Sequence, residues 1–325
     1  MHRRTFLKAA TAVAAMTATQ PAAQAAFATP MRVIDCHIHL FDPTRPGGVP
    51  WPEQSDTVLY HPALPGKYAH LARPHNVVGA IAVECSPWIA DNWWLYDVIE
   101  RNSLMLGYIG DLLPDAPDFQ VALDTLHRSP LFLGIRYGNL WGRDLGAAIE
   151  RPEFQHGLRL LADAGLVLET ANPNGSLIAA VLRVSDRIPN LRIVVDHLPN
   201  AIVPTEANAL AEYEKALREL AQRPNIFVKG SEIVRRIDGD VPLDLGAYRS
   251  GLDQIWDLFG EERILFGSDW PNSDSVATYA EVFRIARDYM RTRSQSAQKK
   301  YFWQNSMKVY RWRARTAEQR RLHQV

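Results

Sequence analysis

The chain of 325 residues has little cysteine, no net charge and no long apolar run. Its two cysteines are too few for the disulfide framework that supports small secreted folds. Basic and acidic residues number 36 each, so no excess of charge points to nucleic acid or to a charged membrane surface as a partner. Apolar residues make up 47%, which provides for a sizeable core, and the length suits one large barrel or two ordinary domains.

The two cysteines, Cys36 and Cys85, each stand at the end of an expected strand. A bridge between them would require the two strands to be neighbours. We expect instead two buried thiols that pack as small apolar residues.

The first residues have the composition of an export signal. Residues 3–8 are basic and include the pair Arg3-Arg4, residues 9–18 are weakly apolar, and residues 23–25 read Ala-Gln-Ala. The apolar run is too short to span a bilayer. We therefore predict a twin-arginine (Tat-type) signal over residues 1–25 and a periplasmic or secreted protein without a stable membrane anchor. The alternative is a disordered Ala-rich tail.

From residue 31 onward, short β-branched runs alternate with amphipathic stretches, the pattern of βαβ units and a parallel sheet. Eight such strands over about 290 residues favour a closed (β/α)8 barrel, or TIM barrel, spanning residues 31–312. The expected strands are residues 32–37, 78–84, 105–109, 131–136, 166–169, 192–197, 226–229 and 264–267. The clearest expected helices are residues 152–164, 206–222, 253–259, 275–290 and 295–312, and residues 40–71 form a long loop after the first strand.

The first expected strand ends in two histidines, His37 and His39, with Asp35 before them. Residues two apart on a strand share a face, so these three side chains are expected to point into the barrel while Cys36 and Ile38 point outward. Two imidazoles at a strand end can bind a divalent metal or orient a polar substrate. Taken alone, such a pair is more often structural.

Other expected strands also end in polar residues, and the carboxyl ends of barrel strands carry the active site in this fold. Burying so many polar groups is costly unless they serve one another or a ligand. The alternative is a set of ion pairs that closes the end of the barrel. The polar residues at or just after the ends of these strands are Glu84, Arg136, Asp196, His197, Lys229, Ser231 and Asp269.

The ordered motifs resemble the amidohydrolase-related family. They are Asp35-x-His37-x-His39, Gly134-Ile135-Arg136, Asp196-His197 and the run from Leu265 to Pro271, which reads Leu-Phe-Gly-Ser-Asp-Trp-Pro. Within that family they look most similar to the lactonase branch, which includes fuconolactonase, sulfomuconolactonase and pyrone-dicarboxylate lactonase. Asn305 and Tyr310 also resemble the usual ending of that group.

The resemblance implies roles for the acid and the histidines. Asp269 would be the general base that activates water and then passes the proton to the leaving alkoxide. His37, His39 and His197 would bind a metal or polarise the carbonyl directly, so that His197 and Asp269 serve catalysis in either case. Glu84 would be a further metal ligand or a hydrogen-bonding group for the substrate.

The same resemblance suggests contacts for the remaining polar residues. Arg136 would hold a substrate carboxylate or hydroxyl, its alternative being an ion pair inside the barrel. Lys229 and Ser231 match a common segment of the family, and for them substrate contact and local structure are both open.

Two features depart from the two-metal members of the superfamily. The fourth strand offers Arg136 where those enzymes carry a bridging carbamylated lysine, and the fifth strand ends in Glu169-Thr170 without a histidine. We therefore expect one divalent metal, zinc before others, or metal-independent catalysis.

The resulting prediction is a hydrolase that opens a lactone of a sugar acid or of an aromatic-degradation intermediate. One rival is a metal-dependent decarboxylase of the same superfamily, and another is a non-catalytic exported binding protein. The expected partner is a small-molecule substrate and not nucleic acid, and the oligomeric state stays open.

Overall fold

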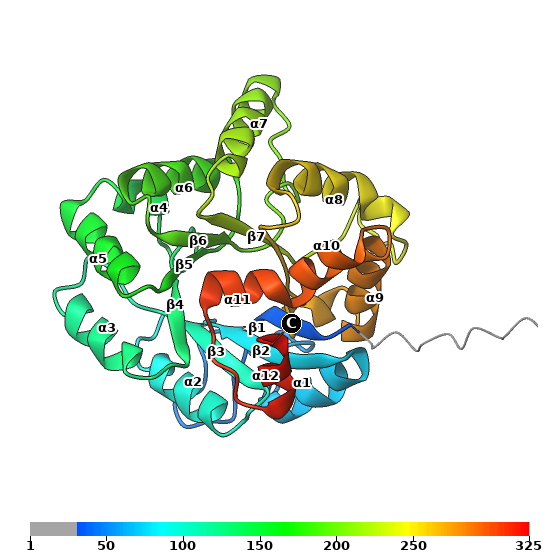
Figure 1. The fold of residues 1–325 in the computed structure, drawn as a ribbon. Coiled ribbons are helices and arrows are strands. Elements are labelled where there is room, and N and C mark those ends of the chain that lie inside the picture. The colour runs from blue at the N-terminus through cyan, green and yellow to red at the C-terminus, as the bar shows by residue number, and fades with distance from the viewer. Residues whose placement is uncertain (1–30, 325) are drawn as a thin grey trace, which may run out of the picture. The chain divides into compact units, whose positions relative to one another are not determined.

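The computed structural model describes residues 31–324, and these form a barrel of eight parallel strands (Figure 1). The strands are hydrogen-bonded in the order in which they occur along the chain, each to the next. Their bounds lie within two residues of those expected from the sequence. They are β1 (Val33–Ile38), β2 (Val77–Val83), β3 (Met105–Gly110), β4 (Phe132–Arg136), β5 (Val167–Thr170), β6 (Arg192–Val195), β7 (Ile226–Gly230) and β8 (Ile264–Phe266).

The barrel closes where β8 meets β1. Beyond β8, Trp270 forms a parallel bridge with Ile38, and the Trp270 carbonyl accepts a 2.7 Å hydrogen bond from the backbone N–H of His39. The backbone N–H of Asp269 donates to the carbonyl of His37 at 2.9 Å. The sequence-based prediction of a (β/α)8 barrel is confirmed, and its seam lies at the predicted reaction centre.

Helices surround the strands, as Figure 1 shows. Most connect one strand to the next. They are α1 (Pro65–Ala72), α2 (Asp91–Glu100), α3 (Phe119–His127), α4 (Leu145–Ala148), α5 (Pro152–Asp163), α6 (Gly175–Arg187), α7 (Ala207–Ala221), α8 (Gly246–Phe259) and α9 (Tyr279–Met290), with short 3-10 turns at Arg73–His75 and Asn272–Ser275.

The C-terminal segment covers the end of the barrel at which the strands begin. It consists of α10 (Gln295–Lys299), a π-helical turn (Lys300–Gln304), α11 (Asn305–Tyr310) and α12 (Ala317–Leu322). The side-chain amide of Asn305 donates to the carbonyls of Glu261 and Ile264, at the start of β8. The single helix expected over residues 295–312 is therefore interrupted by a π turn, and it ends at Tyr310.

The strand β1 is irregular, and this corrects one expectation. Its register with β2 shifts between Asp35 and Ile38, so strict alternation of side chains fails there. Asp35 does not point into the barrel: its carboxylate accepts hydrogen bonds from Tyr68 of α1 at 2.9 Å and from Tyr279 of α9 at 3.1 Å. It anchors the strand to the surrounding helices.

Cys36 and Cys85 are both buried free thiols, as expected, and no bridge joins them. Within residues 31–324, no helix combines the length and the apolar character needed to cross a bilayer. The predicted export signal, residues 1–25, lies outside the described part of the chain.

Candidate active site

Three predicted site residues from β1 and the segment after β8 meet at one point. Nε2 of His37 lies 3.3 Å from Nε2 of His39 and 3.4 Å from Oδ1 of Asp269. Nε2 of His39 lies 3.3 Å from the same carboxylate oxygen. The three atoms thus form a nearly equilateral triangle of two nitrogens and one oxygen.

This triangle fits a tetrahedrally coordinated zinc ion. With metal–ligand bonds of about 2.0–2.1 Å, neighbouring ligand atoms of a regular tetrahedron lie about 3.3–3.4 Å apart. Oδ1 of Asp269 is also buried without a hydrogen-bond partner among the described residues, an arrangement that is costly unless a ligand is bound. The donor set therefore fits one divalent metal.

His197, which follows β6, completes the histidine set. Its ring centroid lies 4.7 Å from that of His37, and the ligand atoms of His37, His197 and Asp269 all lie within 4.8 Å of one another. Nδ1 of His197 is 3.0 Å from the hydroxyl of Ser231, just after β7. Ser231 is almost fully buried and contacts the histidine, so the structure places it behind the site.

Gly267 allows these elements to approach one another. A Cβ atom at this position would lie 2.8 Å from Cβ of His37 and 3.2 Å from Cβ of Ser231, which is too close without a backbone shift. The glycine of the Gly-Ser-Asp-Trp-Pro motif thus lets the ends of β8, β1 and β7 converge.

Several residues around the site have left-handed backbone conformations, which are unfavourable for residues other than glycine. They are Trp141, Asn172, His197, Glu232 and Asp269, with φ between 51° and 64°. All five line one cavity of about 220 Å³ at the carboxyl ends of the strands. Such strain clusters at functional sites, where the surrounding structure holds each side chain in place.

Glu84 and Arg136 form a buried ion pair. Nε of Arg136 donates to Oε1 of Glu84 at 2.6 Å, and Nη1 lies 3.5 Å from Oδ2 of Asp196. The other oxygen of Glu84 accepts from the indole of Trp141 at 3.2 Å and from the backbone of Ser86 at 2.9 Å. The structure therefore does not bring Glu84 into the ligand triangle. For Arg136, the sequence left open a contact with substrate or an ion pair inside the barrel. The structure shows the ion pair, and Arg136 also lines the cavity.

Lys229 lies beneath His37 and does not reach the cavity. Its side chain is fully buried, and its ammonium is 2.6 Å from Oε2 of Glu169, 3.0 Å from Oδ1 of Asp196 and 3.0 Å from Nδ1 of His37. For Lys229, the sequence left open a contact with substrate or a role in local structure. This geometry favours the role in local structure. Tyr310 of α11 donates to the other oxygen of Glu169 and so joins the tail of the chain to this network.

The buried charges shift one another's protonation. Burial and the Lys229 ammonium lower the pKa of His37 well below its usual value, so this imidazole is neutral at physiological pH. Burial alone would raise the pKa of Asp269, but the imidazoles of His197, His39 and His37 lower it below its ordinary range. Lys229 and His37 lower the pKa of Asp196 against the effect of burial. The site thus holds ionised Asp196 and Asp269 beside neutral His37.

The cavity also presents residues that the strand-end motifs did not reveal. Glu232 lies 3.7 Å from Nε2 of His197, and the amide of Asn272 donates to Oδ2 of Asp269 at 2.7 Å. Asn172 and Trp51 complete this part of the wall. These residues lie in loops after the strands, and their side chains reach the site through local turns that have no periodic pattern in the sequence.

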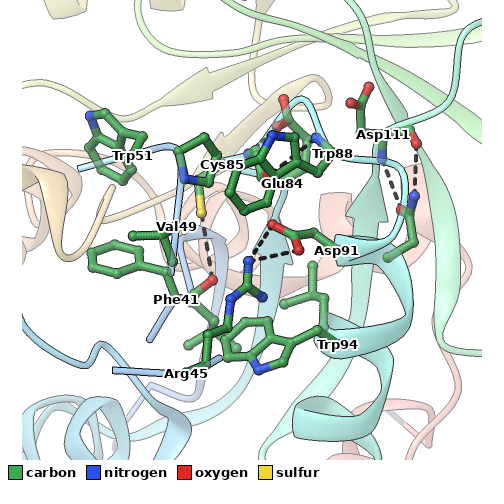
Figure 2. A pocket seen from close by; sticks show the side chains of 15 residues that line it. Phe41, Arg45, Val49, Trp51, Glu84, Cys85, Trp88, Asp91, Trp94 and Asp111 are labelled. Carbon is green, nitrogen blue, oxygen red and sulfur yellow. Dashed lines mark hydrogen bonds and ion pairs between the residues drawn. The ribbon is translucent and has the colours of Figure 1, made fainter. Parts of the chain in front are cut away.

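The long loop after β1 is fixed beside the cavity. Arg45 makes two 2.7 Å hydrogen bonds with Asp91 at the start of α2, and its guanidinium lies over the ring of Trp94 (Figure 2). The hollow drawn in Figure 2 shares Trp51 and Cys85 with the main cavity. The ion pair therefore holds the loop that supplies one aromatic wall.

The sequence matches the amidohydrolase family profile over residues 34–312, which includes the barrel from the second residue of β1 onward and all the site residues above. The chain belongs to the amidohydrolase family. It is therefore an enzyme of the hydrolase class, built on the barrel fold that this family shares.

Relatives of this amidohydrolase agree with that assignment. It is 29% identical over 243 residues to an L-fucono-1,5-lactonase of Burkholderia ambifaria, covering 74% of this chain and 80% of the relative. A crystal structure of an amidohydrolase from Burkholderia multivorans with bound zinc has a TM-score of 0.77 at 24% identity, covering 87% of this chain and all of the other. A protein of Pseudomonas putida described as a putative 2-pyrone-4,6-dicarboxylic acid hydrolase has a TM-score of 0.66 at 21% identity, covering 86% of this chain and 97% of the other. The two solved structures support the fold of the amidohydrolase.

Proposed function

We propose that this amidohydrolase opens a lactone by hydrolysis, with Asp269 as the general base. The observation that carries the proposal is the buried Oδ1 of Asp269, which has no hydrogen-bond partner within residues 31–324 and lies 3.3–3.4 Å from two imidazole nitrogens. A carboxylate held there can take a proton from water while the neighbouring nitrogens face the developing oxyanion. The lactone-hydrolysing relative supports the choice of a cyclic ester.

In the proposed reaction, Asp269 carries one proton from water to the leaving group. Asp269 accepts a proton as the water oxygen bonds to the lactone carbonyl carbon. The bond between that carbon and the ring oxygen then breaks, and Asp269 returns the proton to the ring oxygen, giving a hydroxy acid. The hydrogen bond from Asn272 to Oδ2 fixes the carboxylate so that Oδ1 faces the cavity throughout.

We propose that His37, His39 and Asp269, with His197 beside them, hold one zinc ion. When bound, zinc supplies a Lewis acid that polarises the carbonyl and favours deprotonation of water. Nδ1 of His37, the nitrogen away from the triangle, lies 3.6 Å from Oδ1 of Asp196 and 3.0 Å from the ammonium of Lys229.

The cavity favours an uncharged, hydroxyl-bearing lactone, such as a sugar lactone, over a carboxylated ring. Arg136 is the only cationic side chain among its described lining residues, and Glu84 and Asp196 already neutralise it. The remaining polar wall consists of Glu232, Asn172 and Asn272, which can hydrogen-bond to hydroxyl groups. A substrate carboxylate would find no unpaired lysine or arginine among these described residues and would lie near acidic side chains.

Acid release from paired lactones tests the proposal. We expect a neutral sugar lactone to be hydrolysed at least about 100-fold more efficiently than its carboxylated counterpart. Asp269→Asn should lower kcat by a factor of about 10³, within the range of a general base, while Asp274→Asn, outside the cavity wall, should leave it unchanged. Release of CO2 from a carboxylated ring would favour the decarboxylase, and binding without turnover would favour an exported binding protein.

A further inference from the structure

The ammonium of Lys229 is surrounded by groups that otherwise bind metals. Its three nearest polar neighbours are Oε2 of Glu169, Oδ1 of Asp196 and Nδ1 of His37, at 2.6, 3.0 and 3.0 Å. Lys229, Glu169, Asp196 and His37 each have side-chain exposures of 0%, so this charge is shielded from bulk solvent. The two carboxylate oxygens attract the ammonium, and Nδ1 of His37 can accept from it only when that nitrogen carries no proton.

These three acceptors form a second cluster with the spacing of metal ligands. The ligand atoms of His37, Glu169 and Asp196 all lie within 4.8 Å of one another. One imidazole nitrogen and two carboxylate oxygens suit divalent ions such as manganese and zinc. This cluster shares His37 with the triangle of His37, His39 and Asp269: Nδ1 faces Lys229 and Nε2 faces the triangle, so metal ions in both positions would be joined by His37 as an imidazolate after loss of its ring proton.

We propose that Lys229 is a built-in cation that occupies the position of a second metal ion. The protein thereby fills one of two adjacent cation positions with its own ammonium and leaves only the triangle of His37, His39 and Asp269 for an exchangeable metal. This proposal concerns the cation content of the site, so it stands whichever ester the enzyme hydrolyses.

The buried carboxylates of Glu169 and Asp196 require a positive charge beside them, which supports the role of Lys229 as a built-in cation. Two buried carboxylates without a cation would be strongly unfavourable, because each would lose its hydration without a compensating charge. Arg136 serves the outer side of Asp196, 3.5 Å from Oδ2, and pairs with Glu84, so it does not reach Glu169 or the inner oxygen of Asp196. Lys229 is therefore the group that neutralises Glu169 and the inner oxygen of Asp196.

Counting metal ions bound to full-length variants tests the proposal. Lys229→Met and Lys229→Gln remove the charge and leave the three acceptors in place. After incubation with manganese or zinc and dialysis, we expect each variant to retain about one more ion per chain than the wild-type protein, measured by mass spectrometry. Lys215→Met, which removes an exposed lysine on α7, should not change the count.

A second substitution shows where the added ion binds. Introducing Glu169→Gln into the Lys229→Gln protein should abolish the additional ion, because a carboxylate ligand is lost. If the Lys229 variants are unstable, manganese should raise their unfolding temperature more than that of the wild-type protein. A folded Lys229→Gln protein with the wild-type metal count overturns the proposal, and so do variants that stay unfolded whether or not metal is added.

Discussion

Gly267 is the residue on which the convergence of β8 and β1 depends most directly. In Gly267→Ala, the new methyl group would lie 2.8 Å from Cβ of His37. We expect a loss of about 1–3 kcal/mol in unfolding free energy, as for other overpacked positions, and at least a tenfold loss of kcat/KM, because His37 is displaced from Asp269. Chemical denaturation and lactone turnover measure the two effects.

Gly66→Ala provides a matched control for this substitution. No atom lies within 4 Å of a Cβ built at Gly66, in the first turn of α1. This variant should keep wild-type activity and be at least as stable, because alanine is the better helix former. Equal losses in the two variants would refute the role of close packing at Gly267.

Asp35 should make stability depend on pH. Burial raises the pKa of Asp35, against hydrogen bonds from Ser268, Tyr68 and His37. Its unfolded value is about 3.9, so between that value and the higher folded one the folded state binds more protons. Stability contributed by this group therefore falls as pH rises through that interval. The Asp35→Asn variant has no carboxyl group at this position, so its free energy of unfolding should not fall with pH for this reason.

Urea unfolding between about pH 4 and pH 7 checks this expectation. The unfolding free energy of the wild-type protein should fall relative to that of Asp35→Asn as the pH increases, because only the wild-type protein ionises a buried carboxyl at this position. Asp163→Asn, at an exposed position at the end of α5, serves as control and should show no such trend. A difference between Asp35→Asn and wild type that does not vary with pH would contradict the assignment.

At the scale of residues, the sequence was most informative where a side chain belongs to a strand end. His37, His39, His197 and Asp269 are brought together as expected, because parallel strands end at one edge of the barrel. The direction of Asp35 was predicted wrongly, since a bulge breaks the alternation of side chains. Glu232, Asn172 and Asn272 reach the cavity from irregular loops, where no periodicity fixes a side chain's direction.

At the scale of elements, the loop between β1 and α1 depends on Arg45. Arg45→Met keeps much of the side-chain packing against Trp94 and loses the ion pair with Asp91. The loop, with Trp51 in the cavity wall, should then be less firmly held. We expect KM to rise by about three- to tenfold with little change in kcat, the signature of lost uniform binding.

Arg151→Met gives the matched control for the loop. It breaks another arginine–aspartate pair, Arg151 with Asp115, which does not line the cavity. Steady-state kinetics on the same lactone should show wild-type constants for this variant. If Arg45→Met also left KM unchanged, the loop would not depend on the ion pair.

The elements themselves were predicted to different degrees. Strands buried on both faces are continuous apolar runs with polar ends, and all eight were located within two residues. The helix over residues 253–259 begins earlier, at Gly246, because Tyr248 and Leu252 also pack against the core. The break between α10 and α11 could not be foreseen, since a π turn preserves the apolar pattern that predicts one continuous helix.

At the scale of the whole molecule, the proposed zinc site joins segments that close the barrel. His37 and His39 belong to the end of β1, and Asp269 follows β8. A ligand held by both sides of this seam binds the folded chain and not the unfolded one, so it stabilises the fold by mass action. The export signal predicted for residues 1–25 is compatible with zinc loading before transport, because twin-arginine substrates cross the membrane already folded.

Zinc removal should therefore affect stability as well as catalysis. In zinc at about 100 times its Kd, we expect about 2.7 kcal/mol of added stability in the wild-type protein, seen as a higher unfolding temperature than in chelator. The kcat/KM for a lactone should fall at least tenfold in the chelated protein and return when zinc is restored. His39→Gln, which removes one nitrogen of the triangle, should lose most of the zinc-dependent rise in unfolding temperature. Because this measurement does not require turnover, an unfolding temperature that is the same with zinc and with chelator would show that the triangle does not hold the metal, even if the enzyme hydrolyses lactones.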